Sequence, residues 1–397
     1  MSKAPTTIAC ALCGHEAHWL GEHVASAHGL SVAEYKAEHG PLESVTLVAA
    51  LEIDAPVRKH PNLTNIQIEF AGMKANVNGD VPAEACLPLP DAYRVPAHGA
   101  LAADFREAVI SLISQRSMYV WGMPGSGKDA LFHAWSALTR TPCLPPFQVE
   151  PGEDIRSWFY SRGFGEKGTF IEEGPLLKAL RDGYTTPSGR TLPYMILITD
   201  FDRASEDQAE SMRLVMDSIK GRVKGPNGAV YNIFPGTRIV VTANTAGSGD
   251  SRGRCSSAKG IDASILDRFE RAYEFHWMDW RDEGPIVKEK FPILLAKAPA
   301  VFDQVGAAVE ALRKAIYDEV LYTEFSHRAV CAWLGHAQDI VQVTGQVSPD
   351  LLRRAFRAVA DKMPDPETKA EALRIIDPHL RGGALDQGST THVRGRR

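Results

Sequence analysis

One run of residues in the middle of the chain has the composition of a loop that binds phosphate. The run from Gly122 to Lys128 reads GMPGSGK, follows an apolar stretch at Met118–Trp121 and precedes a helical pattern over 130–138. Glycines let backbone N–H groups turn toward phosphates, the lysine reaches the outer phosphates, and the helix amino end adds its positive dipole. We therefore expect a nucleotide, ATP with Mg²⁺, to contact Gly122, Pro124, Gly125, Ser126, Gly127 and Lys128.

The residue after this lysine departs from the usual pattern. Phosphate loops place Ser or Thr there as a ligand of Mg²⁺, whereas this chain has Asp129. A second polar pair, Thr199 and Asp200, ends the apolar strand pattern at Met195–Thr199. In phosphoryl-transfer enzymes the strand-end carboxylate and the loop hydroxyl meet at the metal.

The segment from Thr199 to Ala204, TDFDRA, resembles the D-E-I-N-R-A Walker B segment of MoxR-type AAA+ ATPases. The resemblance implies that Asp200 is the catalytic acid and that Thr199 stands where a metal-binding Asp is expected. Asp129 and Thr199 would then have exchanged roles, one supplying the carboxylate and the other the hydroxyl to Mg²⁺. In the other register Asp200 is the metal ligand and Phe201 replaces the base, which implies nucleotide binding without hydrolysis.

The resemblance covers most of residues 98–340. The run 241–245, VTANT, resembles the sensor 1 strand, and the following AGSGD resembles a segment of CobS, the AAA+ subunit of aerobic cobaltochelatase. This implies that Asn244 orients the attacking water; the alternative is an ordinary turn residue.

Two arginines receive roles from the same resemblance. The LDRF segment implies that Arg268 points at the γ-phosphate of a neighbouring subunit, and the SHRA segment implies that Arg328 touches the phosphates from the lid of its own subunit. A fixed guanidinium stabilises charge that develops during phosphoryl transfer. The alternatives are a surface ion pair between Asp267 and Arg268, and a helix-surface position for Arg328.

The first 40 residues have the spacing of a small zinc site. Cys10, Cys13, His23 and His28 are arranged as Cys₂His₂ ligands, and a module this small needs the metal to fold. The segment after His28, HGLSVAEYK, resembles the end of Ros/MucR zinc fingers. The alternative is a cysteine pair in a reducing cytosol beside incidental histidines.

The charge of this segment bears on what it binds. Residues 1–40 hold two lysines against four glutamates, and affinity for DNA depends on neutralising phosphates. We therefore favour docking to a protein over reading DNA, although DNA binding stays open.

The alternation of helical patterns with short apolar strands predicts an α/β fold with a parallel sheet, a P-loop core of the AAA+ type and a C-terminal helical lid. Strands are expected at Met118–Trp121, Met195–Thr199 and Arg238–Ala243, and amphipathic helices at 307–320 and 351–363. A short strand or hairpin is expected at 66–70, with a turn at Asn78-Gly79. The predicted domains are a zinc finger (1–40), a linker with a short β segment (41–97), the core (98–283), the lid (284–383) and a disordered basic tail (384–397).

Composition narrows the class of protein. The 397 residues carry 44 Lys and Arg against 49 Asp and Glu, a net charge of -5, which excludes a chain-wide polycation for coating nucleic acid or membrane. No apolar run is long enough to span a bilayer, the first residues do not resemble a secretory signal, and six scattered cysteines do not form a disulfide framework. These features predict a cytoplasmic protein.

Together these features predict a ring-forming MoxR/CobS-like ATPase, a hexamer by resemblance, that uses ATP hydrolysis to remodel a partner. Relatives work with proteins that bear a von Willebrand A domain, so such a partner is implied by resemblance. The aromatic residues Trp158, Phe159, Tyr160 and Phe164 lie where the family has an insertion facing the ring pore, and are either partner contacts or packing residues. Two alternatives stay open: a DNA-tethered regulator with little hydrolysis, and a structural ring component with fixed nucleotide.

Overall fold

The computed structural model describes residues 66–165, 168–217, 219, 221–225, 228–247, 249 and 258–380, with the short pairs 8–9, 16–17 and 26–27. The chain divides into two compact units, Met1–Leu63 and Thr64–Arg397. In the first, β1 (Ile8–Ala9) pairs antiparallel with β2 (Glu16–Ala17). The predicted zinc ligands Cys10, Cys13, His23 and His28, and the predicted basic tail, lie outside the described residues.

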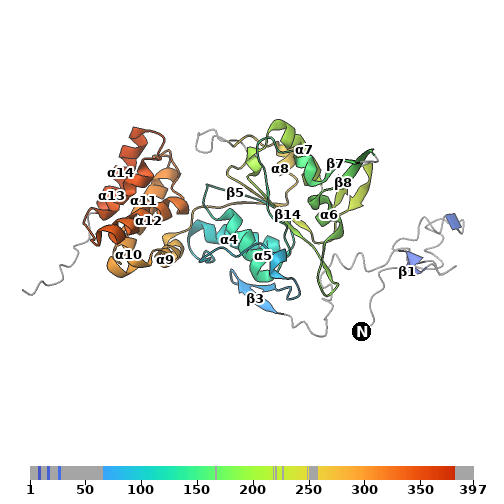
Figure 1. The fold of residues 1–397 in the computed structure, drawn as a ribbon, viewed down its shortest axis with the longest axis horizontal. Coiled ribbons are helices and arrows are strands. Elements are labelled where there is room, and N and C mark those ends of the chain that lie inside the picture. The colour runs from blue at the N-terminus through green and yellow to red at the C-terminus, as the bar shows by residue number, and fades with distance from the viewer. Residues whose placement is uncertain are drawn as a thin grey trace, which may run out of the picture. The chain divides into compact units, whose positions relative to one another are not determined.

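A five-stranded sheet, entirely parallel, forms the centre of the second unit (Figure 1). Its order is β15-β5-β14-β11-β6. The bounds are β5 (Met118–Trp121), β6 (Phe147–Gln148), β11 (Met195–Thr199), β14 (Arg238–Ala243) and β15 (Arg271–Glu274). The three strands predicted from their apolar runs are confirmed, because a strand buried on both faces reads as a continuous apolar segment.

Helices cover both faces of this sheet (Figure 1). On one face, Val120 and Leu197 pack against α4 (Gly99–Ile113) and α5 (Lys128–Thr139). On the other, alternate residues such as Ile198 pack against α6 (Pro175–Asp182), α7 (Glu206–Asp217) and α8 (Ala263–Leu266). The predicted α/β class with a parallel sheet is confirmed.

A β-hairpin precedes α4 and packs into the core. It pairs β3 (Gln67–Phe70) with β4 (Met73–Asn76) and turns at Ala71-Gly72, where both residues have positive φ. The predicted turn at Asn78-Gly79 is confirmed, since the Val81 N–H donates to the Asn78 carbonyl at 3.0 Å, but the hairpin itself reverses earlier, at Ala71-Gly72. Phe70 is buried in one cluster with residues of α4 and α5, so the described part of the predicted linker packs with the α/β core.

Smaller elements join the strands. They are η1 (Ala83–Ala85), η2 (Ile155–Trp158), β7 (Tyr160–Gly165), β8 (Gly168–Glu173), β9 (Tyr184–Thr185), β10 (Thr191–Leu192), η3 (Phe201–Arg203), β12 (Arg222–Lys224) and β13 (Val230–Asn232).

In the aromatic segment, Trp158 and Phe159 are buried in the core, whereas Phe164 on the β7–β8 hairpin is 85% exposed. The first two are therefore packing residues, and Phe164 is available to contact a partner.

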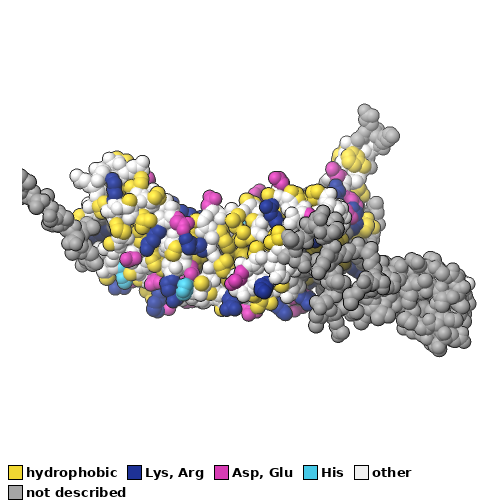
Figure 2. Space-filling view, turned by 90° about the horizontal axis from the view of Figure 1, so that it is seen from below, with side chains coloured by type: hydrophobic (Ala, Val, Ile, Leu, Met, Phe, Trp, Pro, Cys, Tyr) yellow, Lys and Arg dark blue, Asp and Glu magenta, His cyan; other side chains and the backbone are white. Residues whose placement is uncertain are grey.

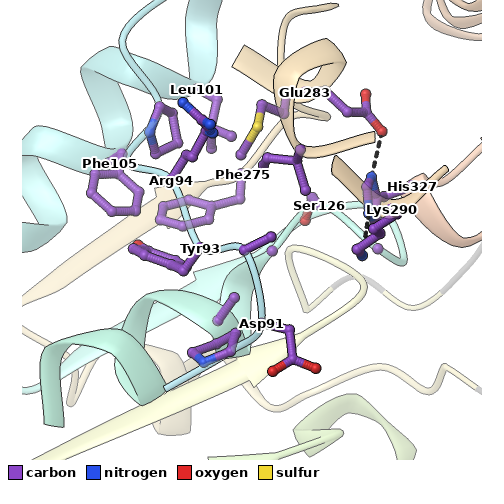
Figure 3. Close-up of a pocket in the computed structure, with 18 of the residues that line it drawn as sticks. Asp91, Tyr93, Arg94, Leu101, Phe105, Ser126, Phe275, Glu283, Lys290 and His327 are labelled. Carbon is purple, nitrogen blue, oxygen red and sulfur yellow. Dashed lines mark hydrogen bonds and ion pairs between the residues drawn. The ribbon is translucent and has the colours of Figure 1, made fainter. Parts of the chain in front are cut away.

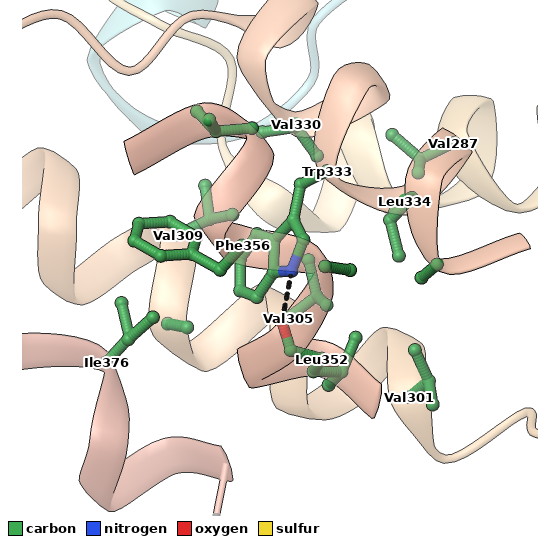
Figure 4. Close-up of a cluster of buried hydrophobic side chains, with 14 of the residues drawn as sticks. Val287, Val301, Val305, Val309, Val330, Trp333, Leu334, Leu352, Phe356 and Ile376 are labelled. Atoms are coloured by element: carbon green, nitrogen blue, oxygen red, sulfur yellow. Dashed lines mark hydrogen bonds between the residues drawn. The ribbon is translucent and has the colours of Figure 1, made fainter. Parts of the chain in front are cut away.

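The C-terminal part is helical. It comprises α9 (Trp280–Lys290), α10 (Pro292–Lys297), α11 (Val301–Tyr317), α12 (His327–Thr344), α13 (Leu351–Ala360) and α14 (Pro366–Leu380). Trp333 and Phe356 meet edge to face at its centre, and the Trp333 indole donates to the Leu352 carbonyl at 2.8 Å (Figure 4). The amphipathic pattern therefore predicted this lid correctly, although α11 and α13 end before the patterns do.

Acidic and basic side chains are interspersed on the face shown in Figure 2. Such a surface agrees with the near-balanced charge of the sequence. None of the helices in the described ranges combines the length and the apolar character that crossing a membrane requires.

Candidate functional site

The phosphate loop connects the end of β5 to the start of α5. Gly122 has φ 151°, and a Cβ there would lie 2.1 Å from the Phe275 carbonyl oxygen. Gly125 has φ 72°, and a Cβ there would lie 2.6 Å from the Ser326 Cβ in the lid. Both positions thus require glycine, since a side chain would meet a close neighbour in a backbone region that other residues avoid.

Lys128 lies at the centre of the loop. Its ammonium donates to the Gly122 carbonyl at 2.7 Å and the Met123 carbonyl at 3.3 Å, and it lies 3.3 Å from Asn244 Oδ1. The Trp277 indole donates to the Pro124 carbonyl at 3.0 Å and holds the loop from the side of the lid. The contact with Asn244 brings the loop lysine and the predicted sensor residue together.

A polar cavity of about 780 Å³ opens beside the loop at the carboxyl ends of the strands. Most predicted site residues line it: Pro124, Gly125, Gly127, Lys128, Asp129, Thr199, Asp200, Asn244 and Arg328. Carboxyl ends of neighbouring parallel strands meet at one edge of a sheet, and ligands of open α/β folds bind there. Residues that are distant in sequence are thereby gathered around one space.

Asp129 is bound to a hydroxyl that the sequence analysis did not single out. Its Oδ1 accepts a hydrogen bond from Thr242 at 2.7 Å. Thr199 lines the same cavity, but its side chain makes no hydrogen bond to Asp129. The carboxylate and hydroxyl oxygens of this group are the donor type that Mg²⁺ prefers. Thr242 lies in β14, two residues before Asn244; its place in this segment was visible in the sequence, but its pairing with Asp129 was not.

Asp200 follows β11 in a left-handed conformation, with φ 56° and ψ 36°. Its Oδ2 accepts from the Gln148 amide at 3.0 Å and lies 3.5 Å from an Arg203 nitrogen. Strained backbone at a non-glycine residue is concentrated at functional sites, where the surroundings hold it in place. Gln148 and Arg203 also line the cavity. Gln148 was missed because a glutamine at the end of a strand carries no motif, whereas Arg203 lies in the TDFDRA segment but received no role there.

Asp202 is fully buried and links two strand ends. Its Oδ2 accepts from the Asn244 backbone N–H at 2.9 Å and from the Thr245 hydroxyl at 3.1 Å. Burial raises the pKa of this carboxyl above its usual value, against the opposing effect of these hydrogen bonds. Asp202 therefore acts as a positioning residue that fixes Asn244 relative to the Asp200 turn.

The two predicted arginines lie in different places. Arg328, in the first turn of α12, lines the polar cavity. Arg268 is not among the lining residues; it is 19% exposed, its Nε donates to Asp217 at 2.9 Å, and it also contacts the Ser264 carbonyl. The predicted alternative partner of Arg268, Asp267, is therefore replaced by Asp217.

A second cavity, of about 210 Å³, lies on the other side of the loop (Figure 3). It is walled mainly by apolar side chains, Leu101, Phe105, Phe275, Met278 and Ile286, with Tyr93 beside them. Gly125, Gly127, Ala130 and His327 line both cavities. A flat apolar group bound here would be continuous with a charged group in the polar cavity.

His327 lines both cavities and belongs to a partly buried polar cluster (Figure 3). Its Nδ1 lies 2.7 Å from Glu283, and its Nε2 lies 3.3 Å from Cys331 Sγ and 3.1 Å from Lys290 Nζ. Glu283 is also paired with the buried Arg313. Burial alone would lower the pKa of His327, but the hydrogen bonds to Cys331 and Glu283 raise it to about 9.

Comparison with known proteins gives a weak sequence relative among the curated proteins. No family model matches the chain. The aerobic cobaltochelatase subunit CobS of Sinorhizobium sp is 21% identical over 237 residues, which span 58% of this chain and 69% of that protein. This similarity agrees with the resemblance found in the sensor segment.

Solved structures with a similar arrangement share little sequence. A point mutant of Thermotoga maritima RuvB matches with a TM-score of 0.43 and 11% identity, covering 66% of this chain and 70% of that chain. A FIGL-1 AAA domain in complex with ADP gives a TM-score of 0.40 and 15% identity over 72% and 90% of the two chains. A putative ATPase from Cytophaga hutchinsonii gives 0.30 and 12% over 69% and 87%.

The fold itself rests on the geometry already described. A phosphate loop joins β5, which lies between β15 and β14 in the sheet, to α5, the sheet is parallel, and a helical lid follows it. The chain therefore has the α/β P-loop architecture with the lid that the resemblance to AAA+ ATPases predicted.

Proposed function

We propose that this protein is an AAA+ ATPase of the MoxR/CobS type that binds and hydrolyses ATP with Mg²⁺. The observation that carries the proposal is the polar cavity, in which Lys128, Asp200 and Asn244 converge beside the phosphate loop. The adjoining apolar cavity fits the same ligand, because a nucleotide combines a polyanion with a flat apolar base.

The residues present suit both ATP and its metal. The backbone of Gly122–Gly127 and the Lys128 ammonium would hold the phosphates, and Asp129 with Thr199 would hold Mg²⁺, with Thr242 as the hydroxyl already in contact with Asp129. Bound Mg²⁺ neutralises charge on the β- and γ-phosphates. The weak similarity to CobS supports the MoxR/CobS assignment.

The chain's own residues then divide the chemistry. Asp200 accepts the proton of the attacking water, and Asn244 orients that water from the neighbouring strand end. Lys128 and Arg328 offset the negative charge that develops on the phosphate oxygens. Asp202 keeps Asn244 in register with Asp200.

The remaining parts of the proposal concern assembly. Arg268 would leave Asp217 and reach the nucleotide of the next subunit in a ring, by resemblance a hexamer. Phe164, exposed on its hairpin, would contact a partner protein during remodelling, and a von Willebrand A domain is the partner class that the resemblance implies. The predicted zinc finger would dock that partner, in the cytoplasm.

Exchange of the acid and the hydroxyl tests the metal site. We expect Asp129→Thr to lower ATP turnover by about tenfold to hundredfold, because it removes a carboxylate, and Asp129→Thr/Thr199→Asp to recover most of it. Turnover is measured by phosphate release, and ADP affinity serves as the control for folding of the loop.

Other results would refute the exchange or favour one of the two alternative functions. Equal loss in the single and double variants would refute the exchange. Absence of turnover in the wild type, with nucleotide retained through purification, would favour the structural ring component. Absence of turnover with tight binding of duplex DNA at low salt would favour the DNA-tethered regulator.

A further inference from the structure

A third cavity lies at the opposite end of the sheet from the phosphate loop. It has a volume of about 200 Å³, and its wall includes Arg238, the first residue of β14. Since β14 ends at Ala243, beside the sensor Asn244, the two ends of the strand are separated by roughly 16 Å at 3.3 Å per residue. This cavity is therefore distinct from the nucleotide site proposed above.

Arg238 is a buried cation whose charge is not compensated. Its side chain is only 3% exposed, and it makes no hydrogen bond or ion pair with any described residue; its Nε is buried without a partner. Burial lowers its pKa to about 10, and the titratable group acting on it is the thiol of Cys143. A guanidinium stays charged at neutral pH, and a buried charge without a partner is strongly destabilising.

The remaining wall of the cavity is also rich in donors. The Trp135 indole N–H, in a residue 4% exposed, is buried without a hydrogen-bond partner. Lys74, Asn76, Asn78 and Gln115 contribute further donors, and no Asp or Glu occurs among the described residues that line the space. Two unpartnered buried donors, a second cation and the lack of carboxylates all select for a ligand that carries negative charge and accepts hydrogen bonds.

We propose that this cavity binds a small oxyanion, either inorganic phosphate or a small carboxylate, through the Arg238 guanidinium and the Trp135 indole. The oxyanion supplies the missing counter-charge of Arg238 and accepts from donors that are otherwise buried unpaired. The volume restricts the ligand to a few heavy atoms, since drug-sized ligands occupy pockets of about 300 Å³ or more.

Calorimetric titration of the full-length protein tests this site, with phosphate and malonate as separate probes and chloride as the control ion. Saturating ADP and Mg²⁺ keep the phosphate loop occupied, and the Lys128→Ala protein repeats the titration with that loop disabled. We expect saturable binding of phosphate or malonate in both settings, and a rise in Tm with the same anion. The anion that binds more tightly shows whether the cavity prefers phosphate or a small carboxylate.

Two variants and one control test whether the anion binds in this cavity. Gln115→Glu places a carboxylate in the cavity wall at an exposed position, so we expect it to weaken anion binding by at least about tenfold and to raise Tm without anion. Gln346→Glu makes the same charge change in the lid and should leave binding unchanged. Trp135→Phe removes the indole donor and should weaken binding about tenfold.

The proposal is overturned by any of three results. One is the absence of binding by both anions when ADP is present. Another is an equal affinity in wild type and Gln115→Glu. The third is anion binding that disappears in Lys128→Ala, which would assign it to the phosphate loop.

Discussion

The two cavities that flank the phosphate loop differ in the side chains that line them. One is lined by a lysine, carboxylates, two amides and two arginines, and the other mainly by aliphatic and aromatic groups. They share Gly125, Gly127 and His327. The difference shows that one short loop separates a polar surface from an apolar surface, as the proposed nucleotide, with its charged phosphates and flat base, requires.

The largest expected effect is on the chemical step in the polar cavity. Asp200→Asn keeps the shape of the residue but removes its capacity to accept a proton, so we expect turnover to fall by about 10²- to 10⁴-fold. Nucleotide affinity, measured by fluorescence titration with a labelled ADP, should change little. Unchanged turnover would show that Asp200 is not the base, whereas nucleotide binding without any turnover in the wild type would favour the second register of the Walker B segment.

Lys128→Ala should weaken ligand binding on the polar side by about a hundredfold, because the ammonium supplies charge-assisted hydrogen bonds. Inorganic tripolyphosphate is a probe that has no base. We expect its affinity and that of ATP to fall together, as measured by calorimetry. A loss confined to ATP would contradict the assignment of Lys128 to the phosphates.

A substitution in the apolar cavity should weaken the binding of ATP alone, and not that of tripolyphosphate. Ile286→Ala removes buried apolar contact area and should weaken ATP binding by about tenfold, while leaving tripolyphosphate affinity unchanged. Leu295→Ala, on an exposed lid position, is the matched control. Equal weakening of both ligands by Ile286→Ala would mean that no base occupies the apolar cavity.

A further effect, on stability and not on ligand affinity, concerns His327, which lines both cavities. Because its pKa is raised to about 9 in the folded protein, the stabilisation by Glu283 and Cys331 is complete below about pH 6.5 and lost as pH rises through 9. We expect His327→Gln to remove roughly 2 kcal/mol of the stability that the wild type loses over that range.

Denaturant unfolding of both proteins at several pH values measures this difference. Lys290 Nζ, 3.1 Å from His327 Nε2, is repelled by the protonated ring and must move away, which limits the gain. Arg313 also faces the cluster, paired with Glu283. Parallel pH curves for wild type and His327→Gln would refute the linkage.

The sequence predicted one side of this comparison and not the other. The strands β5, β11 and β14 read as uninterrupted apolar runs, and their carboxyl ends carry Lys128, Asp200 and Asn244 in recognisable segments. The apolar cavity is built from pieces around residues 91–105 and 275–290 that meet only in the folded chain. Apolar side chains in such pieces look the same whether they pack in a core or line a pocket.

The hydrogen-bond partners of individual side chains also could not be predicted from the sequence. The order of residues in the segment around β14 did not indicate that Thr242 donates to Asp129, or that Asp202 accepts a hydrogen bond from the Asn244 backbone. The turn at Asn78-Gly79 could be predicted because Asn-Gly is a strong turn signal, whereas the reversal at Ala71-Gly72 between β3 and β4 could not, because Ala71 adopts φ 54°, which alanine rarely does. Local propensity gave way to the packing of Phe70 against Trp135.

The close approach of Gly125 to Ser326 has a mechanical consequence. The cap of α12 rests on a backbone atom that has no side chain to act as a spacer. Rotation of the lid would therefore shift the peptide groups that would surround the phosphates, so a force applied to the lid would reach a bound nucleotide through this contact together with the hydrogen bond from Trp277 to Pro124.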